Sequence, residues 1–330
     1  MKSFLLTSLI LTTPALAQSP EIGVIDFYGV RTIPVARLRE ALKIKEGDSV
    51  TPVLGEGAER LQAVPGVQRA TIDAVCCESG KLTLYVGIEE SGAPALAFSP
   101  APTGTIALPE AIMRGYRDFE SAFEAAIRAG DFAEDDSLGH SLMHYPAARA
   151  AQERFVQLAS DHRAVLVTVL HQSATQEHRA IAAQVLAYSP DKKEIIGDLV
   201  RATRDPFSTV RNNAVRALAL IAGFGRRNPG RGIMVPSEPL VDLLNSLVWT
   251  DRNKASMALM QISDARDPAL LAQLRARALP PLIEMAQWKA MGHATAPLVI
   301  LGRIAGMPDA DIFAALASNR REPILEAIRR

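Results

Sequence analysis

The sequence predicts a small α+β domain followed by an all-α solenoid of repeated helix pairs. Two observations carry this fold class. Short runs with periods of 2 and 3.6 residues alternate between residues 22 and 90, whereas helical patterns recur with a shared spacing over residues 163–263. With 48% hydrophobic and 22% charged residues among 330, the chain has enough apolar side chains for a large core.

The first residues predict export. Lys2 precedes a short apolar stretch, Phe4 to Leu11, and the small residues Ala15 and Ala17 follow it. Such a start is typical of a secretory signal peptide, and the apolar stretch is shorter than the roughly 20 residues that a membrane helix needs. We expect a signal peptide over residues 1–17, cleaved after Ala17. The mature chain is then expected in the periplasm or outside the cell, with no transmembrane segment.

Residues 18–90 are predicted to form the α+β domain, in the order strand, helix, helix, strand, strand. The first strand ends at Gly29, and the first helix begins at Pro34 and closes near Gly47. The last strand shows a period of two, because apolar residues alternate there with others. The apolar positions of that strand are Leu82, Leu84, Val86 and Ile88.

The order and landmarks of these elements resemble a POTRA (polypeptide-transport-associated) domain. The landmarks are Gly29, the helix end Lys45-Glu46-Gly47-Asp48 and the strand entry Leu61-x-x-Val64-Pro65-Gly66-Val67. The resemblance implies binding of extended polypeptide segments at a sheet edge. Members of that family usually precede an outer-membrane barrel, whereas no run of alternating strands follows residue 90. The resemblance therefore implies partner docking rather than barrel assembly.

The two cysteines, Cys76 and Cys77, are adjacent, so they cannot join distant segments into a disulfide framework. A vicinal disulfide, a thiol linked to a partner and two free thiols all fit an oxidising compartment. The charges balance, with 36 Lys+Arg and 36 Asp+Glu, so no overall field attracts nucleic acid. We expect no nucleic-acid partner.

A proline-rich linker over residues 91–108 and a helical lead-in over residues 109–162 are predicted next. The first helix of the lead-in begins at Pro109 and ends at Gly130. A loop that is rich in acidic residues and histidine follows it. One face of that helix carries Ile112, Tyr116, Phe119 and Phe123.

Residues 163–330 are predicted to form the solenoid and its C-terminal cap. Each of three units pairs a helix rich in branched apolar residues with a second helix. The second helices carry Ala, apolar and Leu residues at offsets 0, +3 and +4, starting at Ala182, Ala214 and Ala255. Small residues at these positions let helices approach closely. Three residues before each alanine lies an arginine: Arg179, Arg211 and Arg252.

These units look like HEAT repeats, an armadillo-like helical architecture, because Asp205-Pro206 separates the helices of the middle unit and Val210-Arg211 follows. The resemblance implies a stack that binds macromolecules on a curved surface. The three arginines are expected to form an inter-repeat ladder with acids such as Asp205. The loop over residues 223–239 is expected to hold the extra residues of the longer unit. Further helices are expected near residues 268–279, 282–291, 297–305, 308–317 and 322–329.

A metal site is one hypothesis for the histidine-rich stretch. His140 and His144 are four residues apart, which is a metal-ligand spacing on a helix, and Asp136 is the third candidate ligand. Gly139 and Pro146 bracket the pair and favour irregular backbone, and no known metal pattern is complete. No nucleophile signature is found either, so neither catalysis nor a cofactor is expected.

The sequence thus favours an exported scaffold of the bacterial cell envelope. Its protein partners would bind the helical-repeat surface and the POTRA-like sheet edge. Two alternatives stay open. One is a metal-dependent enzyme centred on the His/Asp cluster at residues 134–178, and the other is a structural spacer in the envelope.

Overall fold

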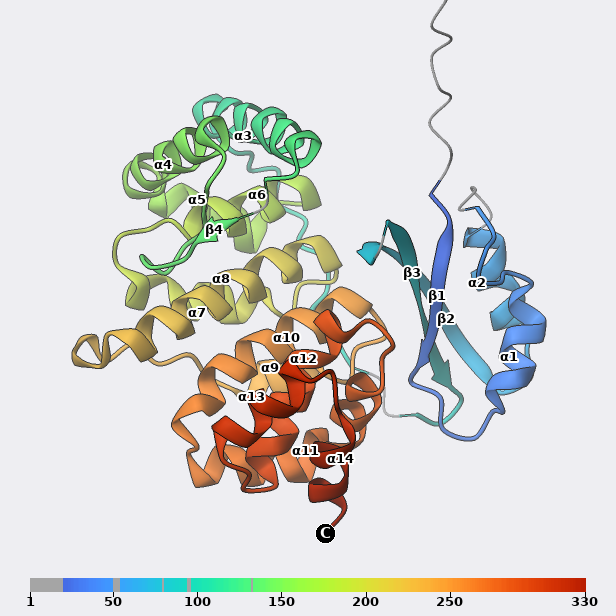
Figure 1. Cartoon of the computed structure of the whole chain (residues 1–330). Coiled ribbons are helices and arrows are strands. Elements are labelled where there is room, and N and C mark those ends of the chain that lie inside the picture. The colour runs from blue at the N-terminus through green and yellow to red at the C-terminus, as the bar shows by residue number, and fades with distance from the viewer. Residues whose placement is uncertain (1–19, 50–53, 79, 94–95, 132) are drawn as a thin grey trace, which may run out of the picture.

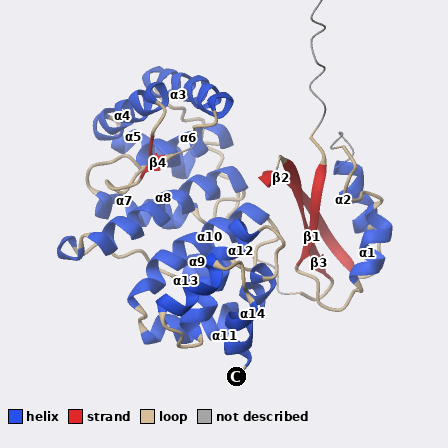
Figure 2. Cartoon of the chain, in the orientation of Figure 1, coloured by secondary structure: helices blue, strands red, loops and turns tan. Residues whose placement is uncertain are grey.

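The computed structural model describes residues 20–49, 54–78, 80–93, 96–131 and 133–330. A small α/β unit at the N-terminus is followed by a stack of helices (Figures 1 and 2). This confirms the predicted fold class. No helix in the described part of the chain is both long and apolar enough to cross a membrane.

The α/β unit has a three-stranded sheet in the order β1-β3-β2, formed by β1 (Ile22–Tyr28), β3 (Lys81–Glu90) and β2 (Val67–Glu78). β1 runs parallel to β3, and β2 runs antiparallel to it. Helices α1 (Val35–Leu42) and α2 (Leu54–Gln62) supply the apolar cover of one face. The core between them and the sheet includes Leu38, Leu42, Leu61, Leu84, Val86 and Ile88.

The opposite face of the sheet packs against the helical stack, so that all of β3 after Lys81 is buried. The ring of Tyr85 stacks on Trp249 at a centroid distance of 4.9 Å and lies 4.8 Å from Trp288. The Tyr28 hydroxyl donates to the Leu247 carbonyl at 2.6 Å. The alternating strand therefore contributes to two cores at once, one on each face.

Gly87 lies at this interface, where the backbones of sheet and stack come close together. A Cβ atom there would lie 2.6 Å from the Leu247 carbonyl oxygen and 2.7 Å from the Tyr28 hydroxyl. These distances are shorter than van der Waals contact, so a side chain at position 87 would push the two parts of the chain apart.

Asp26 is a buried carboxylate of the same interface and accepts a hydrogen bond from the Lys289 backbone N–H at 2.8 Å. Burial raises the pKa of Asp26, although the Lys289 hydrogen bond and the charges of Lys289, Arg39 and Arg321 oppose the change. A raised folded-state pKa means that this group stabilises the fold fully below its unfolded pKa. That stabilisation is lost as pH rises through the folded pKa.

Asp26→Asn is therefore expected to stabilise the protein at neutral pH, because asparagine keeps the acceptor oxygen without a buried charge. The gain in unfolding free energy should be near zero at about pH 3 and should grow as pH rises through the folded pKa. Urea unfolding at several pH values measures it. Asp118→Asn, at an exposed ion pair with Arg154, is the control. A gain that is largest in acid would contradict the assignment.

The helical part begins with α3 (Glu110–Ala129) and α4 (Pro146–Asp161), and helices then follow in pairs. The second helix of each pair packs on the second helix of the next. The alanines at 182, 214 and 255 are fully buried there, as close helix approach requires. The pairs are α5 (Arg163–Gln172) with α6 (Gln176–Leu186), α7 (Lys192–Ala202) with α8 (Ser208–Arg227), α9 (Glu238–Leu243) with α10 (Trp249–Ile262), α11 (Pro268–Ala286) with α12 (Met291–Ile304), and α13 (Asp309–Ala317) with α14 (Glu322–Arg329).

Several predicted boundaries are wrong. α1 ends at Leu42 rather than near Gly47, and α12 begins at Met291 rather than near residue 297. Two further differences concern α11 and α8. α11 is one helix, although a break was expected between residues 279 and 282, because Leu274, Ala278, Leu282 and Met285 form one continuous buried face across Pro280 and Pro281. The extra residues of the longer unit do not all lie in the loop over residues 223–239, since α8 continues to Arg227. In both places tertiary packing decides the length of the helix.

The segment over residues 96–108, which we call the strap, lies along the turns between paired helices. The Ser99 N–H donates to the Arg204 carbonyl at 2.7 Å, and Gly104 exchanges two backbone hydrogen bonds with Gln172 and Ala174. The apolar side chains of the strap pack against the helical core: Leu96, Phe98, Ile106 and Leu108.

Candidate functional site

Two adjoining cavities of about 570 and 540 Å³ form a groove over the second helices of the first units. α3 borders the groove on one side, and residues of α6, α8 and α10 form its floor. The two cavities are one groove because they share six lining residues: Tyr116, Glu120, Gln184, Asn212, Asn213 and Thr250. This is the candidate binding site.

An aromatic wall on α3 borders the groove. Tyr116, Phe119 and Phe123 line it, and their spacing of three and four residues places them on one helical face. Phe119 stacks on Phe123 at 5.7 Å and contacts Phe155 of α4 at 5.6 Å. Phe123 keeps 38% of its surface exposed, so a ligand in the groove would find an uncovered aromatic ring.

Side-chain amides form the floor of the groove. The Thr250 hydroxyl donates to Asn212 Oδ1 at 2.7 Å, and Asn212 Nδ2 donates to Asn213 Oδ1 at 3.1 Å. Asn213 Nδ2 donates in turn to the Ala180 carbonyl at 2.9 Å. Each primary amide has two N–H donors and two acceptor lone pairs, so this chain of hydrogen bonds leaves donors and acceptors over for a ligand.

The inner end of the groove carries two cations and one anion. Arg216 of α8 donates to both carboxylate oxygens of Glu134 at 2.6 and 2.5 Å. Glu134 belongs to a short hairpin of β4 (Glu134–Asp135) and β5 (Leu142–Met143). Lys254 of α10 lines the same end, and burial, followed by the charge of Arg216, lowers its pKa.

The outer cavity is acidic, because Glu177 lines it and Glu120 lies where the two cavities meet. Burial, followed by the charges of Glu120 and Glu177, raises the pKa of Tyr116 to about 12. The groove therefore has opposite electrostatic character at its two ends, which favours one orientation of a charged ligand.

The residues of the metal hypothesis face different partners. His140 is buried, with Nδ1 2.9 Å from Lys192 Nζ, and burial followed by that ammonium lowers its pKa to about 4. His144 is exposed and pairs with Asp131 at 3.0 Å, and Asp136 pairs with Arg227 at 3.2 Å. In the ranges that the structure describes, no three His, Cys, Asp or Glu side chains gather as metal ligands. The structure does not bring His140, His144 and Asp136 together.

The three arginines of the proposed ladder are buried and paired with acids of the next unit. Arg179 donates to both carboxylate oxygens of Asp205, at 2.7 and 3.1 Å. Arg211 makes the same double contact with Asp251, and Arg252 donates to Glu284 at 2.7 Å. The structure thus brings Arg179 and Asp205 together. It adds Asp251 and Glu284, which the sequence did not single out.

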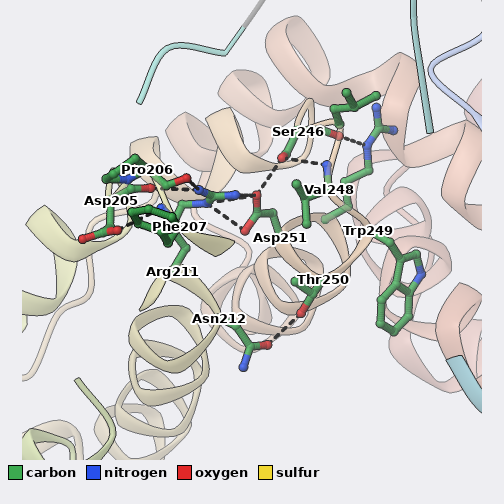
Figure 3. Close-up of polar contacts among 12 residues, drawn as sticks. Asp205, Pro206, Phe207, Arg211, Asn212, Ser246, Val248, Trp249, Thr250 and Asp251 are labelled. Atoms are coloured by element: carbon green, nitrogen blue, oxygen red, sulfur yellow. Dashed lines mark hydrogen bonds and ion pairs between the residues drawn. The ribbon is translucent and has the colours of Figure 1, made fainter. Parts of the chain in front are cut away.

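Each ladder arginine also holds the turn that precedes its own helix. All three donate to the carbonyl six residues earlier, which belongs to Ser173, Asp205 or Ser246. Figure 3 shows Arg211 between the Asp205–Pro206 turn and Asp251, and Asn212 facing Thr250; these last two residues line the groove. The ladder therefore fixes the helices that carry the groove floor.

An aromatic ring covers each ladder guanidinium, and two of the rings come from outside the repeats. Phe98 of the strap lies 3.8 Å from the Arg211 guanidinium carbon, and Tyr28 of the sheet lies 4.6 Å from that of Arg252. Phe207 covers Arg179 at 5.4 Å. These contacts are cation–π interactions, and they keep water from the ion pairs.

Two further predictions lie outside the described residues. The signal cleavage residues Ala15 and Ala17 precede the described part of the chain. Strand β2 includes positions 76 and 77, but the side chains of Cys76 and Cys77 are outside the description.

The sequence pattern did not predict the groove. It placed Tyr116, Phe119 and Phe123 on one helix face. That pattern alone does not distinguish a face buried in the core from a face that lines a groove. The remaining signal is the pair Asn212 and Asn213, which are polar residues beside the buried Ala214. Polar residues there indicate a helix face that a neighbouring helix does not cover.

Comparison with protein-family profiles and with curated proteins finds no match. Solved structures with partial similarity include an engineered protein from a structural genomics consortium, with 23% identity and a TM-score of 0.38 over 56% of this chain and 91% of that one. A designed armadillo repeat protein in complex with the peptide (KR)4 has 21% identity and a TM-score of 0.36, with coverage of 56% and 85%. Computationally designed armadillo repeat proteins for modular peptide recognition have 21% identity and a TM-score of 0.36, over 55% of this chain and 85% of that one. At these TM-scores, the likeness adds nothing to what the helix pairs themselves establish.

Proposed function

We propose that this chain is a non-enzymatic scaffold for protein partners, and that its groove holds an extended polypeptide segment of a partner. The supporting observation is an aromatic wall that faces a floor of side-chain amides. Amides donate to and accept from main-chain groups, and aromatic rings cover apolar side chains. The cavity volume lies within the range of about 300–1,000 Å³ that is usual for binding sites.

Phe123 supplies the test, and Phe313 on α13 is its matched control. Both are partly exposed, at 38% and 49%, but only Phe123 lines the groove. A photo-crosslinking benzoyl-phenylalanine is placed at either position, and we expect capture of a partner segment from position 123 only. Unlabelled protein should compete for this capture, whereas unlabelled protein with Phe123→Ser should not. Mass spectrometry of the crosslinked peptide identifies the segment. Equal capture at both positions would contradict groove binding, and the structural-spacer alternative predicts capture at neither.

A second binding surface is proposed at the outer edge of β2. The strand order β1-β3-β2 leaves β2 with one side that pairs with no strand among the described residues. Unpaired backbone groups of this kind add an extended segment as a further strand. Slower amide exchange in β2 upon partner binding is the expected result. Unchanged exchange would remove this surface from the proposal.

We also propose that the protein works in the cell envelope after export. The basis is the signal-like start, with Lys2, the apolar stretch and the Ala15/Ala17 pair. Expressed in a bacterial host with its own leader, the protein is expected in the periplasmic fraction with Gln18 as its first residue. Intact-mass analysis shows whether residues 1–17 have been removed. Ala17→Leu should block cleavage and preserve the uncleaved chain, whereas the control Ser8→Ala should be cleaved normally. A cytosolic product that keeps residues 1–17 would contradict export.

A further inference from the structure

Lys254 is a half-buried cation without a counter-ion of its own. No hydrogen bond and no ion pair reaches its ammonium from the part of the chain that the structure describes, although the side chain lines the groove. Both carboxylate oxygens of nearby Glu134 already accept hydrogen bonds from Arg216. Among the described residues, Lys254 is therefore a cation of the inner end that no carboxylate holds by a hydrogen bond or ion pair.

The surroundings of Lys254 favour the binding of an anion at its ammonium. A desolvated ammonium without a partner is unfavourable. An anion that enters the groove therefore binds with a more favourable free energy there than at an exposed lysine. Trp249 and Phe119 line the same cavity and offer apolar contact to the carbon chain that would carry the anion. Glu177 lines only the outer cavity and repels an anion there, so the cavity that holds Lys254 is the favoured place for it.

The sheet lies behind this end of the groove. Trp249 stacks on Tyr85 of β3, and its backbone N–H points at Asp73 of β2 at 3.4 Å. The α/β unit therefore packs against the groove at Trp249, which lines the same cavity as Lys254. A chain terminus fits such an end, since nothing has to continue past it.

We propose that Lys254 receives a carboxylate of the bound polypeptide segment at the inner end of the groove. The proposal rests on the proposed function and adds the chemistry of the ligand. The carboxylate has two sources, the C-terminus of the segment or an Asp or Glu side chain. Both make a charge-assisted hydrogen bond to the Lys254 ammonium, and the sheet that packs behind Trp249 favours the C-terminus.

Two libraries of random heptapeptides, alike except for a free-acid or an amidated C-terminus, test the proposal with the full mature chain. Peptides from the free-acid library are expected to bind roughly 10- to 100-fold more tightly than their amidated forms. Lys254→Met should remove the difference, while Lys193→Met, at an exposed lysine outside the groove, should leave it unchanged. Thermal unfolding should show that Lys254→Met is folded, because the substitution removes a desolvated charge.

The outcomes separate the two proposals. Enrichment of Asp or Glu in binders from both libraries supports a side-chain carboxylate, whereas binders confined to the free-acid library support the C-terminus. Binders that need Phe123 but are indifferent to carboxylates and to Lys254→Met would overturn this inference and leave groove binding intact. The absence of any binder that depends on Phe123 would overturn both.

Discussion

Replacing Arg211 by alanine is expected to lower the free energy of unfolding by about 3–5 kcal/mol, because Asp251 is then left buried without its partner. Both side chains are essentially inaccessible to solvent. Arg211 also donates to the carbonyls of Asp205 and Pro206, so its loss leaves two more acceptors unpaired. For a protein whose total stability is about 5–15 kcal/mol, this is a large fraction. Urea unfolding and the melting temperature measure the change.

The matched control is Arg204→Ala, because Arg204 forms an exposed ion pair with Asp242 and should cost at most about 1 kcal/mol. The double variant Arg211→Ala/Asp251→Ala should cost less than the sum of the single variants, since no charge is left unpaired in it. Arg211 is not among the groove-lining residues, so peptide binding should survive at temperatures where the variant is folded. Loss of binding without loss of stability would overturn the structural role.

Tyr85→Ala is expected to destabilise the protein by roughly 3–5 kcal/mol and to release the sheet from the stack. The ring is fully buried among Trp249, Trp288 and His293, and its hydroxyl lies 2.7 Å from His293 Nδ1. Removing the ring leaves a large cavity between the two parts of the chain. Denaturant unfolding measures the loss, and limited proteolysis within the strap over residues 96–108 reports the separation of the sheet.

Two companion variants define the cause. Tyr85→Phe keeps the ring and should cost only about 1 kcal/mol, the usual value of one hydrogen bond. Gly87→Ala should destabilise through its close contact with the Leu247 carbonyl, whereas Gly197→Ala should not, since its Cβ would meet nothing within 4 Å. If Tyr85→Ala and Tyr85→Phe had equal effects, ring packing would not be the source of the stability.

The location of helices and strands was predictable wherever a periodic pattern is strong. The alternation in β3 and the repeated Ala positions at 182, 214 and 255 each mark a buried face. Periodicity reports that a face is buried but not what covers it. The pattern in β3 therefore says nothing of Trp249 or Trp288, which lie more than 150 residues away along the chain.

The candidate site was less predictable, because it depends on side chains from four separate helices. The wall comes from α3, and the floor comes from α6, α8 and α10. Spacing alone suggested His140 and His144 as a pair, yet Gly139 and the hairpin turn them towards Lys192 and Asp131. A spacing match in irregular backbone carries little information, since only a regular helix converts it into a shared direction.

The local elements, their order and the arginine in the first turn of each of three second helices follow from composition and spacing along the chain. The three-dimensional packing shows which acids pair with those arginines, that the sheet packs on the stack through Tyr85, and that α3 borders one side of a groove. The physical reason is that burial, ion pairing and cavity shape depend on residues distant in sequence. Their partners are chosen by packing rather than by the local pattern.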